Sequence, residues 1–422
     1  MIEPNAYQNA FPDEVTIMNK TINARMLERN LDVLIAFGSS SDPNFSYLTE
    51  GSDVGDSVFV KIRDEPAHIW VSFLDRENVK PQDLTVHQFD RSLYLRIIEQ
   101  THRPEVADVE VYLQCLEILP RKVSRIAFYG RLEYSFASLI QETVRQRYPH
   151  IELISDFSPN VIEQSRAVKT EAELERIKEV GRKTSQVVKD TRDFIRGHKV
   201  NDNQFIKSDK SPLTVGDVKH YIRRRLFEYG LEDPDGAIFA PGIQGTVGHL
   251  SGEAETPIRL GEQIIFDLYP REPKGYYHDI TRTWSFGYAS DAMLKLYDDV
   301  FTCFKMIQTK ALPGVTGGRL QDLTCEYFRD KKYPVVKDDP NTVDGYTHSL
   351  GHGVGLNVHE LPYLGLDEKN VLEAGNVFAM EPGLYDTKTG LAGRVEDTFY
   401  IDQDGRCIDI TDVPYDLVIP ID

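Results

Sequence analysis

The chain has 422 residues, with 48 Lys or Arg and 67 Asp or Glu, so its formal charge at pH 7 is −19. A charge of this sign repels nucleic-acid phosphates and anionic membranes, which argues against a main role in binding either. Hydrophobic residues make up 41% of the chain, which supports a buried core. The length suits roughly two or three domains.

The sequence carries no pattern of membrane insertion or secretion. No apolar run reaches the ~18 residues of a transmembrane helix. The first residues, MIEPNAYQNAFPDE, lack a positive segment followed by an apolar one, so we expect no secretory signal. The four cysteines form no C-x-x-C pair, so we expect free thiols and a cytoplasmic location. These cysteines are Cys115, Cys303, Cys325 and Cys407.

The N-terminal part alternates between helical and strand-like segments. Such alternation is typical of an α/β domain with a mixed or mostly parallel sheet. The expected helices cover residues 14–30 and 134–147, and the expected strands cover residues 33–37, 57–61, 68–73, 125–129 and 151–154.

A long charged helix is expected to open the second domain. Thr170 followed by Glu173 fits a capping box, and apolar residues from Leu174 to Ile195 recur at near-helical spacing. Gly197 is a plausible C-terminal stop. We therefore place the domain boundary just before this helix.

The second half has the pattern of an antiparallel sheet with helices alongside, which is an α+β domain. Gly-rich turns separate its strand-like runs. The expected strands cover residues 263–269, 276–286, 377–384 and 393–401. We expect an α/β domain over residues 1–164 and an α+β domain over residues 165–422.

The segment IIFDLYPREPKGYYHDITRTW places one acid, Asp267, at a strand end and another, Asp279, on the returning strand. Two ionised carboxylates brought together in this way repel each other unless a cation or a shared proton lies between them. An acid at a strand end is more often a solvated turn residue, so this pair alone decides nothing. His278 should point to the opposite strand face, and we interpret it as structural.

A second segment, HSLGHGVGLNVHE, contains His348, His352 and His359, three of the chain's 11 histidines. The glycines between them let the backbone approach other groups closely. Clustered histidines are typical of a catalytic or metal site, although any one of them could be a core residue.

Two further acids lie near turns or in apolar strands. FAMEPGLY places Glu381 before a Pro-Gly turn, and GRVEDTFYI places Glu396 inside an expected half-buried strand. A buried carboxylate needs a partner. Arg394, two residues away on the same strand face, could form a salt bridge with Glu396, which is the competing interpretation.

Together, two Asp, two Glu and one His could form an oxygen-rich metal site. Four carboxylates carry up to −4, so one divalent ion would leave −2, whereas two ions would balance the charge. The count favours two ions bridged by carboxylates about 3.5–4 Å apart, which is a site for metal-assisted hydrolysis.

These motifs resemble the pita-bread metallopeptidases, which include methionine aminopeptidase, aminopeptidase P, prolidase and creatinase. NFSYLTEG (residues 44–51) resembles a recurring stretch of the N-terminal domain, and VKTEAELERIK (residues 168–178) resembles the start of the catalytic domain. The resemblance therefore covers nearly the whole chain. It implies a creatinase-like α/β N-terminal domain and an α+β pita-bread catalytic domain.

The resemblance also implies a ligand set. In the family pattern Asp267 binds one metal ion, Asp279 and Glu396 bridge both ions, and His352 and Glu381 bind the second. Glu381 also helps to activate the water or to shuttle its proton. Asp267 and Asp279 lie 12 residues apart, one more than is typical of the family, and we expect the PREPKG turn to absorb the extra residue.

Catalytic and substrate-binding roles carry over in the same way. His249, in GTVGHLSGE, matches a histidine of the substrate pocket. His359 matches the one that contacts the substrate carbonyl and supports the tetrahedral intermediate. The resemblance assigns supporting positions around the site to His348, Arg394, Thr281 and Thr283.

The leading hypothesis is a dinuclear metallopeptidase that removes the residue before proline, either an Xaa-Pro aminopeptidase or an Xaa-Pro dipeptidase. Its substrate would be a proline-containing peptide or dipeptide. Its two divalent ions could be manganese, cobalt, zinc or iron, with manganese favoured. The resemblance also implies a homodimer. Methionine aminopeptidase is disfavoured because it has no need of the N-terminal domain.

Two alternatives stay open. A non-peptidase enzyme could use the same scaffold, as ectoine hydrolase and a dimethylsulfoniopropionate lyase do, because fold does not determine substrate. Creatinase itself is metal-free and is disfavoured because all five ligand positions are present. A catalytically dead binding module is disfavoured for the same reason.

Overall fold

The computed structural model describes residues 14–80, 83–366 and 368–421. The chain divides into two compact units, Met1–Arg166 and Ala167–Asp422. Within the described residues, no helix is both long and apolar enough to cross a membrane. All four cysteines are free thiols, as expected, and three of them are buried.

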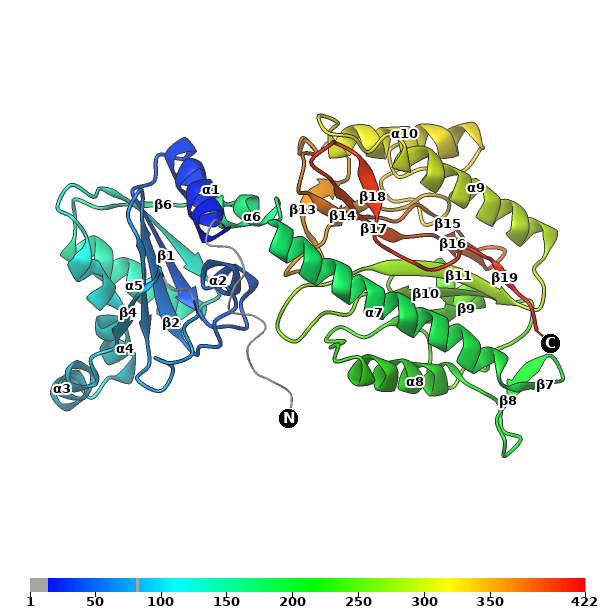
Figure 1. Ribbon diagram of the computed structural model, residues 1–422, viewed down its shortest axis with the longest axis horizontal. Coiled ribbons are helices and arrows are strands. Elements are labelled where there is room, and N and C mark those ends of the chain that lie inside the picture. Colours follow the sequence, from blue (N-terminus) through cyan, green and yellow to red (C-terminus); the bar gives the residue numbers. More distant parts are fainter. Residues whose placement is uncertain (1–13, 81–82, 367, 422) are drawn as a thin grey trace. The chain divides into compact units, whose positions relative to one another are not determined.

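The N-terminal unit is a six-stranded mixed sheet flanked by helices (Figure 1). Its strands are β1 (Val33–Gly38), β2 (Ser57–Ile62), β3 (Ala67–Val71), β4 (Thr85–Gln88), β5 (Arg125–Gly130) and β6 (Glu152–Ile154). Its helices are α1 (Glu14–Glu28), α2 (Pro43–Leu48), α3 (Arg91–Thr101), α4 (Pro104–Tyr112), η1 (Leu113–Ile118), α5 (Tyr134–Arg147) and α6 (Val161–Arg166).

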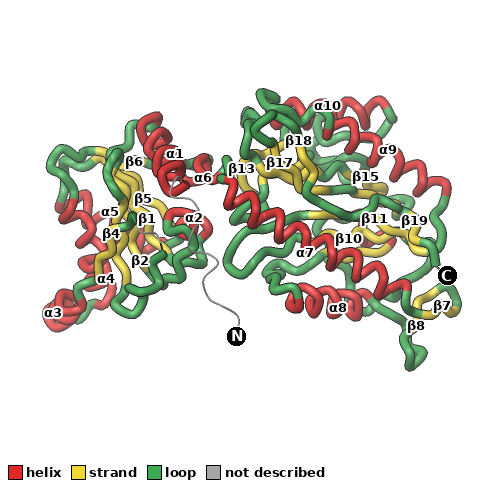
Figure 2. The backbone as a smooth tube through the Cα atoms, viewed as in Figure 1, coloured by secondary structure: helices red, strands yellow, loops and turns green. Residues whose placement is uncertain are grey.

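The strand order of this sheet is β4-β3-β2-β1-β5-β6. The central strand β1 is antiparallel to β2 and parallel to β5, so the sheet is mixed. Figure 2 shows helices on either side of the strands. The prediction of an α/β domain is confirmed, although the edge strand β4 and the helices α2, α3, α4, η1 and α6 were not anticipated.

The second unit opens with α7 (Glu171–Arg196), the long helix that the sequence predicts. The Thr170 hydroxyl accepts a hydrogen bond from the Glu173 N–H (3.3 Å), and the Glu173 carboxylate accepts one from the Thr170 N–H (2.7 Å). This is the expected capping box, and the helix ends at Gly197 as predicted.

Two sheets and two short ribbons make up the strands of this unit. The first sheet contains β9 (Ile238–Pro241), β10 (Gln263–Leu268), β11 (Ile280–Phe286) and β19 (Val418–Ile419), in the order β19-β11-β10-β9. The second sheet contains β12 (Gly351–Gly353), β13 (Glu360–Leu364), β14 (Val377–Met380), β17 (Asp397–Ile401) and β18 (Cys407–Asp409), in the order β13-β12-β14-β17-β18. The ribbons are β7 (Lys199–Asn201) with β8 (Gln204–Ile206), and β15 (Gly383–Asp386) with β16 (Leu391–Arg394).

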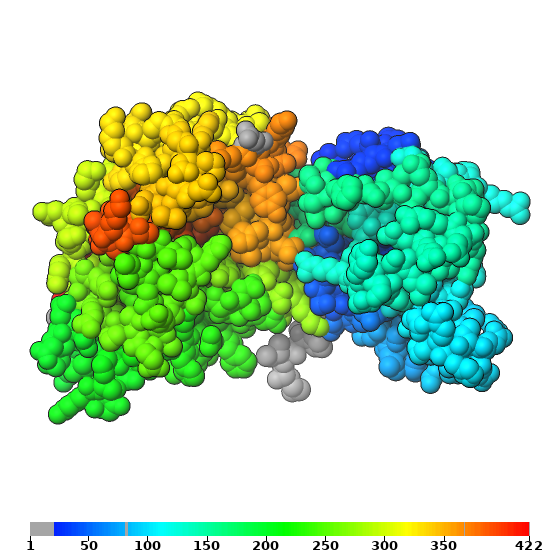
Figure 3. All heavy atoms as spheres, turned by 180° about the vertical axis from the view of Figure 1, so that it is seen from behind, coloured from blue at the N-terminus to red at the C-terminus, as the bar shows by residue number. Residues whose placement is uncertain are grey.

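Helices pack on these strands through two separate apolar cores. The helices α7 and α8 (Val215–Glu228) share one core with β10 and β11, in which Val187, Ile222 and Trp284 are buried. The helices α9 (Asp291–Gln308) and α10 (Gly317–Asp330) share the other core with β14 and β17. A short helix, η2 (Gly242–Thr246), follows β9. In Figure 3 the orange and red C-terminal segments reach the surface between the yellow and the green ones.

Alternation along β10 directs one acid away from the α7 and α8 core. Phe266 and Leu268 belong to that core, whereas Ile265 packs with Tyr385 and Ala392 on the other side. Because successive side chains of a strand point to opposite faces, Asp267 shares the face of Ile265. The hydrophobic pattern of this strand therefore decides which side of the sheet receives the carboxylate.

Two predicted strands are wrong in one respect: each is broken at its acid. Residues 377–384 form β14 and β15, which separate at Glu381 and Pro382 and join different sheets. Residues 393–401 form β16 and β17, which separate at Val395 and Glu396. At the first break, Pro382 has no N–H to donate to a neighbouring strand. At the second break, the backbone N–H of Glu396 donates to the Thr281 carbonyl oxygen instead of to the partner strand of β16. Single-sequence periodicity cannot detect such a change of partner.

His278 is structural, as interpreted from its strand position. Its ring is fully buried, and its Nε2 lies 3.1 Å from the Thr411 hydroxyl. It packs against α7 at Gly181, where a Cβ atom would lie 2.6 Å from the His278 Cδ2. The glycine therefore lets the helix approach the β10–β11 hairpin closely.

Replacing Gly181 by Ala should destabilise the second unit, although Ala favours a helix over Gly by about 1 kcal/mol. The new Cβ would overlap the His278 ring, and overpacking of this kind costs about 1–3 kcal/mol. The difference between this cost and the helix-propensity gain is a net loss of up to about 2 kcal/mol in the free energy of unfolding, measured by urea unfolding. Trp284 fluorescence in a Trp70→Phe background reports on this unit, because the chain has only these two tryptophans.

The double variant Gly181→Ala/His278→Ala provides the control, because it removes the overlapping ring. We expect it to be at least as stable as His278→Ala alone. A Gly181→Ala variant that is more stable than the wild type would contradict the proposed close contact.

Candidate metal centre

Three buried side chains, those of Asp279, His352 and Glu396, offer ligand atoms that lie within 4.8 Å of one another. His352 Nε2 is 3.8 Å from Asp279 Oδ2 and 4.0 Å from Glu396 Oε1. It is also 3.7 Å from Glu381 Oε1. Asp279 lies just before β11, His352 lies in the middle of β12, and the two glutamates lie at the strand breaks described above.

Glycines on either side of His352 allow this placement. A Cβ atom on Gly351 would lie 2.0 Å from the Ala379 carbonyl oxygen, and one on Gly353 would lie 2.1 Å from that of Leu361. Only glycine therefore allows β12 to lie this close to both neighbouring strands. This close packing brings the imidazole next to the carboxylates.

The tautomer of His352 follows from its backbone contact. Its Nδ1 lies 3.2 Å from the Gly353 carbonyl oxygen, which can only accept, so Nδ1 carries the proton. Burial lowers the pKa of His352 to about 3, with a further contribution from His359, so the ring is neutral. Its Nε2 lone pair then faces three carboxylates, an arrangement that is unfavourable unless a cation lies between them.

Arg394 does not pair directly with Glu396, so the competing interpretation of Glu396 as a salt-bridge residue is wrong. Its Nη2 lies 2.5 Å from Asp267 Oδ2, and its Nε donates to the Thr281 hydroxyl (3.1 Å). Thr281 in turn donates to Glu396 Oε2 (2.7 Å). The break between β16 and β17 is the reason, because two residues on either side of a strand end need not share a face.

The two threonines of the DITRT segment support this arrangement. Thr281 lies between Arg394 and Glu396, as just described. The Thr283 hydroxyl donates to the Arg394 carbonyl oxygen (2.8 Å) and accepts from the Arg394 N–H (2.9 Å). Both side chains are fully buried.

The three other predicted histidines lie around this cluster. The exposed ring of His359 meets the ring of His352 edge to face, with their centroids 4.1 Å apart. His348 Nδ1 lies 2.8 Å from the Ser349 carbonyl oxygen. His249 is exposed. Burial is the main cause that lowers the pKa of His348, to about 4, and the charges of Arg394 and His249 lower it further.

Sequence reasoning missed Tyr385. Its buried hydroxyl lies 2.9 Å from His348 Nε2 and 3.1 Å from Arg394 Nη1. It therefore joins a predicted substrate-binding histidine to the arginine that holds Asp267. A tyrosine in an apolar strand, four residues after Glu381, was the available signal, because a buried tyrosine hydroxyl usually has a partner.

Burial sets the electrostatics of the four acids. It is the main cause that raises the pKa of Asp267, Asp279 and Glu396, and the negative neighbours of Asp279 and Glu396 raise theirs further. The pKa of Glu381 is raised to about 8. The Arg394 charge opposes the rise in each case. One arginine therefore does not neutralise the group.

The cluster fits divalent metal ions. Within the part of the chain that is described, Asp267 Oδ1, Asp279 Oδ1 and Glu396 Oε1 are buried without a hydrogen-bond partner. Buried polar atoms normally have one, and carboxylate oxygens with one imidazole are ligands for manganese, cobalt, zinc or iron. The four carboxylates and Arg394 sum to −3, so one ion would leave −1 and two would leave +1. Charge alone therefore does not decide the number of ions.

Comparison with known proteins identifies the family. The sequence profile of Metallopeptidase family M24 matches residues 175–403, which is more than half of the chain. The chain belongs to metallopeptidase family M24. This confirms the resemblance to the pita-bread metallopeptidases.

Two curated relatives show how far the M24 similarity extends. The chain is 32% identical to the uncharacterized peptidase YqhT of Bacillus subtilis over 216 residues, which are 51% of this chain and 57% of that protein. It is 28% identical to the Xaa-Pro dipeptidase of Pyrococcus furiosus over 290 residues, which are 68% of this chain and 74% of that protein. The match thus spans a little more than half of YqhT.

Solved structures share the fold over nearly the whole M24 chain. The Xaa-Pro dipeptidase from Bacillus anthracis has a TM-score of 0.72 at 21% identity, covering 96% of this chain and 100% of its own. The X-Pro aminopeptidase from Thermotoga maritima has a TM-score of 0.69 at 21% identity, and the match covers 93% of this chain and 99% of that chain. The expected fold class is confirmed.

The stability of the metal-free protein should increase as the pH falls from 8.5 to 6.5. The raised pKa of Glu381, about 8, means that the folded chain binds more protons than the unfolded chain over this range. The other three raised carboxyl pKa values act in the same direction. The lowered pKa values of His278, His348 and His352 act oppositely, but their effect is confined to pH values near and below the usual histidine value of about 6.5.

Urea unfolding in EDTA, at several pH values, measures this dependence. The Glu381→Gln variant should show a flatter profile, because its side chain does not titrate. Saturating Mn²⁺ should abolish the increase, since bound cations keep the carboxylates ionised. A metal-free protein that becomes less stable toward pH 6.5 would contradict the expected electrostatics.

Proposed function

We propose that this chain is a dinuclear metallopeptidase that cleaves the bond between an N-terminal residue and a following proline, with the Xaa-Pro dipeptidase form favoured. The observation that carries the proposal is the convergence of Asp279, His352 and Glu396, with partnerless carboxylate oxygens, in a chain of family M24. The names of the curated relatives from two Pyrococcus species, both Xaa-Pro dipeptidases, support the substrate class.

Five residues would hold two divalent ions. They are Asp267, Asp279, His352, Glu381 and Glu396, of which Asp279 and Glu396 would contact both ions. Manganese is favoured, because carboxylates make up most of the donor set. When bound, such a pair lowers the pKa of a water molecule and polarises a carbonyl group.

Glu381 would move the proton of the attacking water. Its side chain is 20% exposed, whereas those of Asp279 and Glu396 are almost fully buried. Burial raises the pKa of Glu381 to about 8 in the metal-free site. A group of this kind can accept a proton and then donate it to the leaving nitrogen.

The histidines outside the ligand set would bind the substrate. His359 is exposed beside His352 and would donate to the substrate carbonyl oxygen. His348 carries its proton on Nδ1, because Nδ1 faces the Ser349 carbonyl oxygen, so its Nε2 accepts from Tyr385. Arg394 keeps Asp267 oriented, and His249 would contact the substrate from its exposed loop. We also propose that the protein acts in the cytoplasm and as a homodimer.

The direct test is hydrolysis by Mn²⁺-loaded protein of Xaa-Pro dipeptides and Xaa-Pro-Xaa tripeptides, with Xaa-Ala peptides as the comparison. We expect cleavage before proline, faster for the dipeptides. Glu381→Gln and Asp279→Asn should each lower kcat by at least about 100-fold, in line with the loss of a proton-transfer group or of a metal ligand.

Glu232→Gln is the matched control, because Glu232 pairs with Arg271 outside the cluster and should not affect kcat. Faster cleavage of tripeptides would identify an aminopeptidase. No cleavage at any metal loading would reject the proposal, and ectoine and dimethylsulfoniopropionate, assayed in parallel, test the non-peptidase alternatives.

A further inference from the structure

Arg282 lies on the opposite face of β11 from the metal centre. Thr281 and Thr283 point toward Arg394, so the side chain between them points the other way. The guanidinium is only 1% exposed, and all five of its N–H groups donate. Its acceptors are the carbonyl oxygens of Thr281 (3.0 Å), Glu396 (2.9 Å), Val413 (2.8 Å) and Pro414 (3.1 Å) and the Asp397 carboxylate (2.8 Å).

One nitrogen of Arg282, Nη1, stabilises the backbone contact between β11 and Glu396. Thr281 and Glu396 form a two-residue β-bridge through their backbones (3.3 and 3.1 Å). Nη1 of Arg282 donates to the carbonyl oxygens of both bridge residues. On the other face, the Thr281 hydroxyl donates to the Glu396 carboxylate. The Glu396 backbone and side chain are therefore held from two sides of the strand.

The next two residues connect this bridge to Asp279. Asp397 balances the Arg282 charge with no exposed surface of its own. The Thr398 hydroxyl accepts from the Asp279 N–H (3.0 Å) and donates to the Asp279 carbonyl oxygen (2.8 Å). The segment from Glu396 to Thr398 thus contains Glu396 and also fixes the backbone of Asp279.

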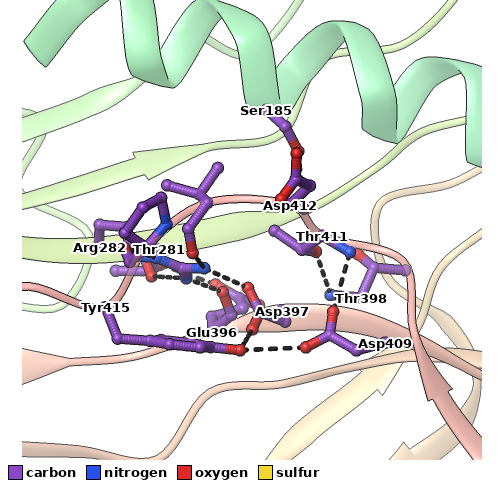
Figure 4. Close-up of polar contacts among 12 residues, drawn as sticks. Ser185, Thr281, Arg282, Glu396, Asp397, Thr398, Asp409, Thr411, Asp412 and Tyr415 are labelled. Atoms are coloured by element: carbon purple, nitrogen blue, oxygen red, sulfur yellow. Dashed lines mark hydrogen bonds and ion pairs between the residues drawn. The ribbon is translucent and has the colours of Figure 1, made fainter.

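Tyr415 completes the support behind the strands (Figure 4). Its ring lies 4.5 Å from the Arg282 guanidinium carbon, and its hydroxyl contacts the Asp397 and Asp409 carboxylates. Figure 4 shows Tyr415 and Arg282 converging on Asp397. The Tyr415 hydroxyl therefore orients the carboxylate that Arg282 holds.

We propose that Arg282, oriented by Asp397 and Tyr415, is a positioning residue that sets the spacing of the Asp279 and Glu396 carboxylates for a pair of divalent ions. The inference rests on the proposed function, because these two acids are the ones expected to contact both ions. A spacing error of about 0.5 Å is enough to weaken such a site. Outer contacts of this kind typically change metal affinity 10–100-fold.

The test is the binding of Mn²⁺ to the metal-stripped full chain, measured by isothermal titration calorimetry. Arg282→Lys keeps the charge but removes the planar set of five donors, so we expect the Kd for Mn²⁺ to rise about 10–100-fold. Tyr415→Phe removes only a hydroxyl, so a rise of about tenfold is expected. The electron paramagnetic resonance signature of two coupled Mn²⁺ ions should weaken in parallel, which a purely structural role would not cause in a folded variant.

Tyr129→Phe is the matched control, because Tyr129 also donates from a buried position to an aspartate, Asp156, but does so in the N-terminal unit. Its Kd should equal that of the wild type. Circular dichroism establishes that each variant is folded. If Arg282→Lys does not fold, the Kd of Tyr415→Phe for Mn²⁺ alone tests the positioning role.

The outcomes separate this inference from the proposed function. The positioning role would be overturned if the wild type binds Mn²⁺ and cleaves Xaa-Pro peptides while folded Tyr415→Phe and Arg282→Lys show the wild-type Kd for Mn²⁺. That result would leave the proposed function unaffected. An equal loss of affinity in Tyr129→Phe would also overturn it. A wild-type chain that binds neither Mn²⁺ nor Co²⁺, Zn²⁺ or Fe²⁺ would overturn both.

Discussion

Mutual repulsion among four carboxyl groups, three buried and one half-buried, is the constraint on which the rest of the second unit depends. The groups are those of Asp267, Asp279, Glu381 and Glu396, and burial raises the pKa of each. Arg394 offsets one charge, and the neutral ring of His352 adds none. Such a group can stay ionised near neutral pH only with added positive charge. Metal binding and the folding of this region are therefore coupled.

The fold delivers these acids by interrupting strands. Glu381 follows β14 and Glu396 precedes β17, so each lies where one sheet ends and the next strand begins. Residues at such breaks can direct side chains into a space that a continuous strand would fill with its neighbour. The two helix pairs bury the apolar faces of the strands that carry these acids. Low local dielectric strengthens every charge interaction within the site.

The molecule places its charged groups in two layers around β11. On one face lie Thr281, Thr283 and the acids, and on the other lies Arg282 with its five acceptors. In the second layer, Asp397 forms a buried ion pair with Arg282. The first layer is left with excess negative charge. This division explains how one strand can carry both a stable buried ion pair and a site that requires cations.

Local chemistry was sufficient to predict several features from the sequence. The capping box of Thr170 and Glu173, the α5 range and the range of β10 depend on neighbouring residues, and single-sequence patterns record such relations. The acids and histidines beside glycines and turns drew attention in the sequence, and the resemblance proposed ligand roles for them; the structure brings three of them, Asp279, His352 and Glu396, together. The sequence did not show the strand breaks, the pairing of Arg394 with Asp267, or the network of Arg282. These depend on which strands meet across more than one hundred residues of chain, and only tertiary packing decides that.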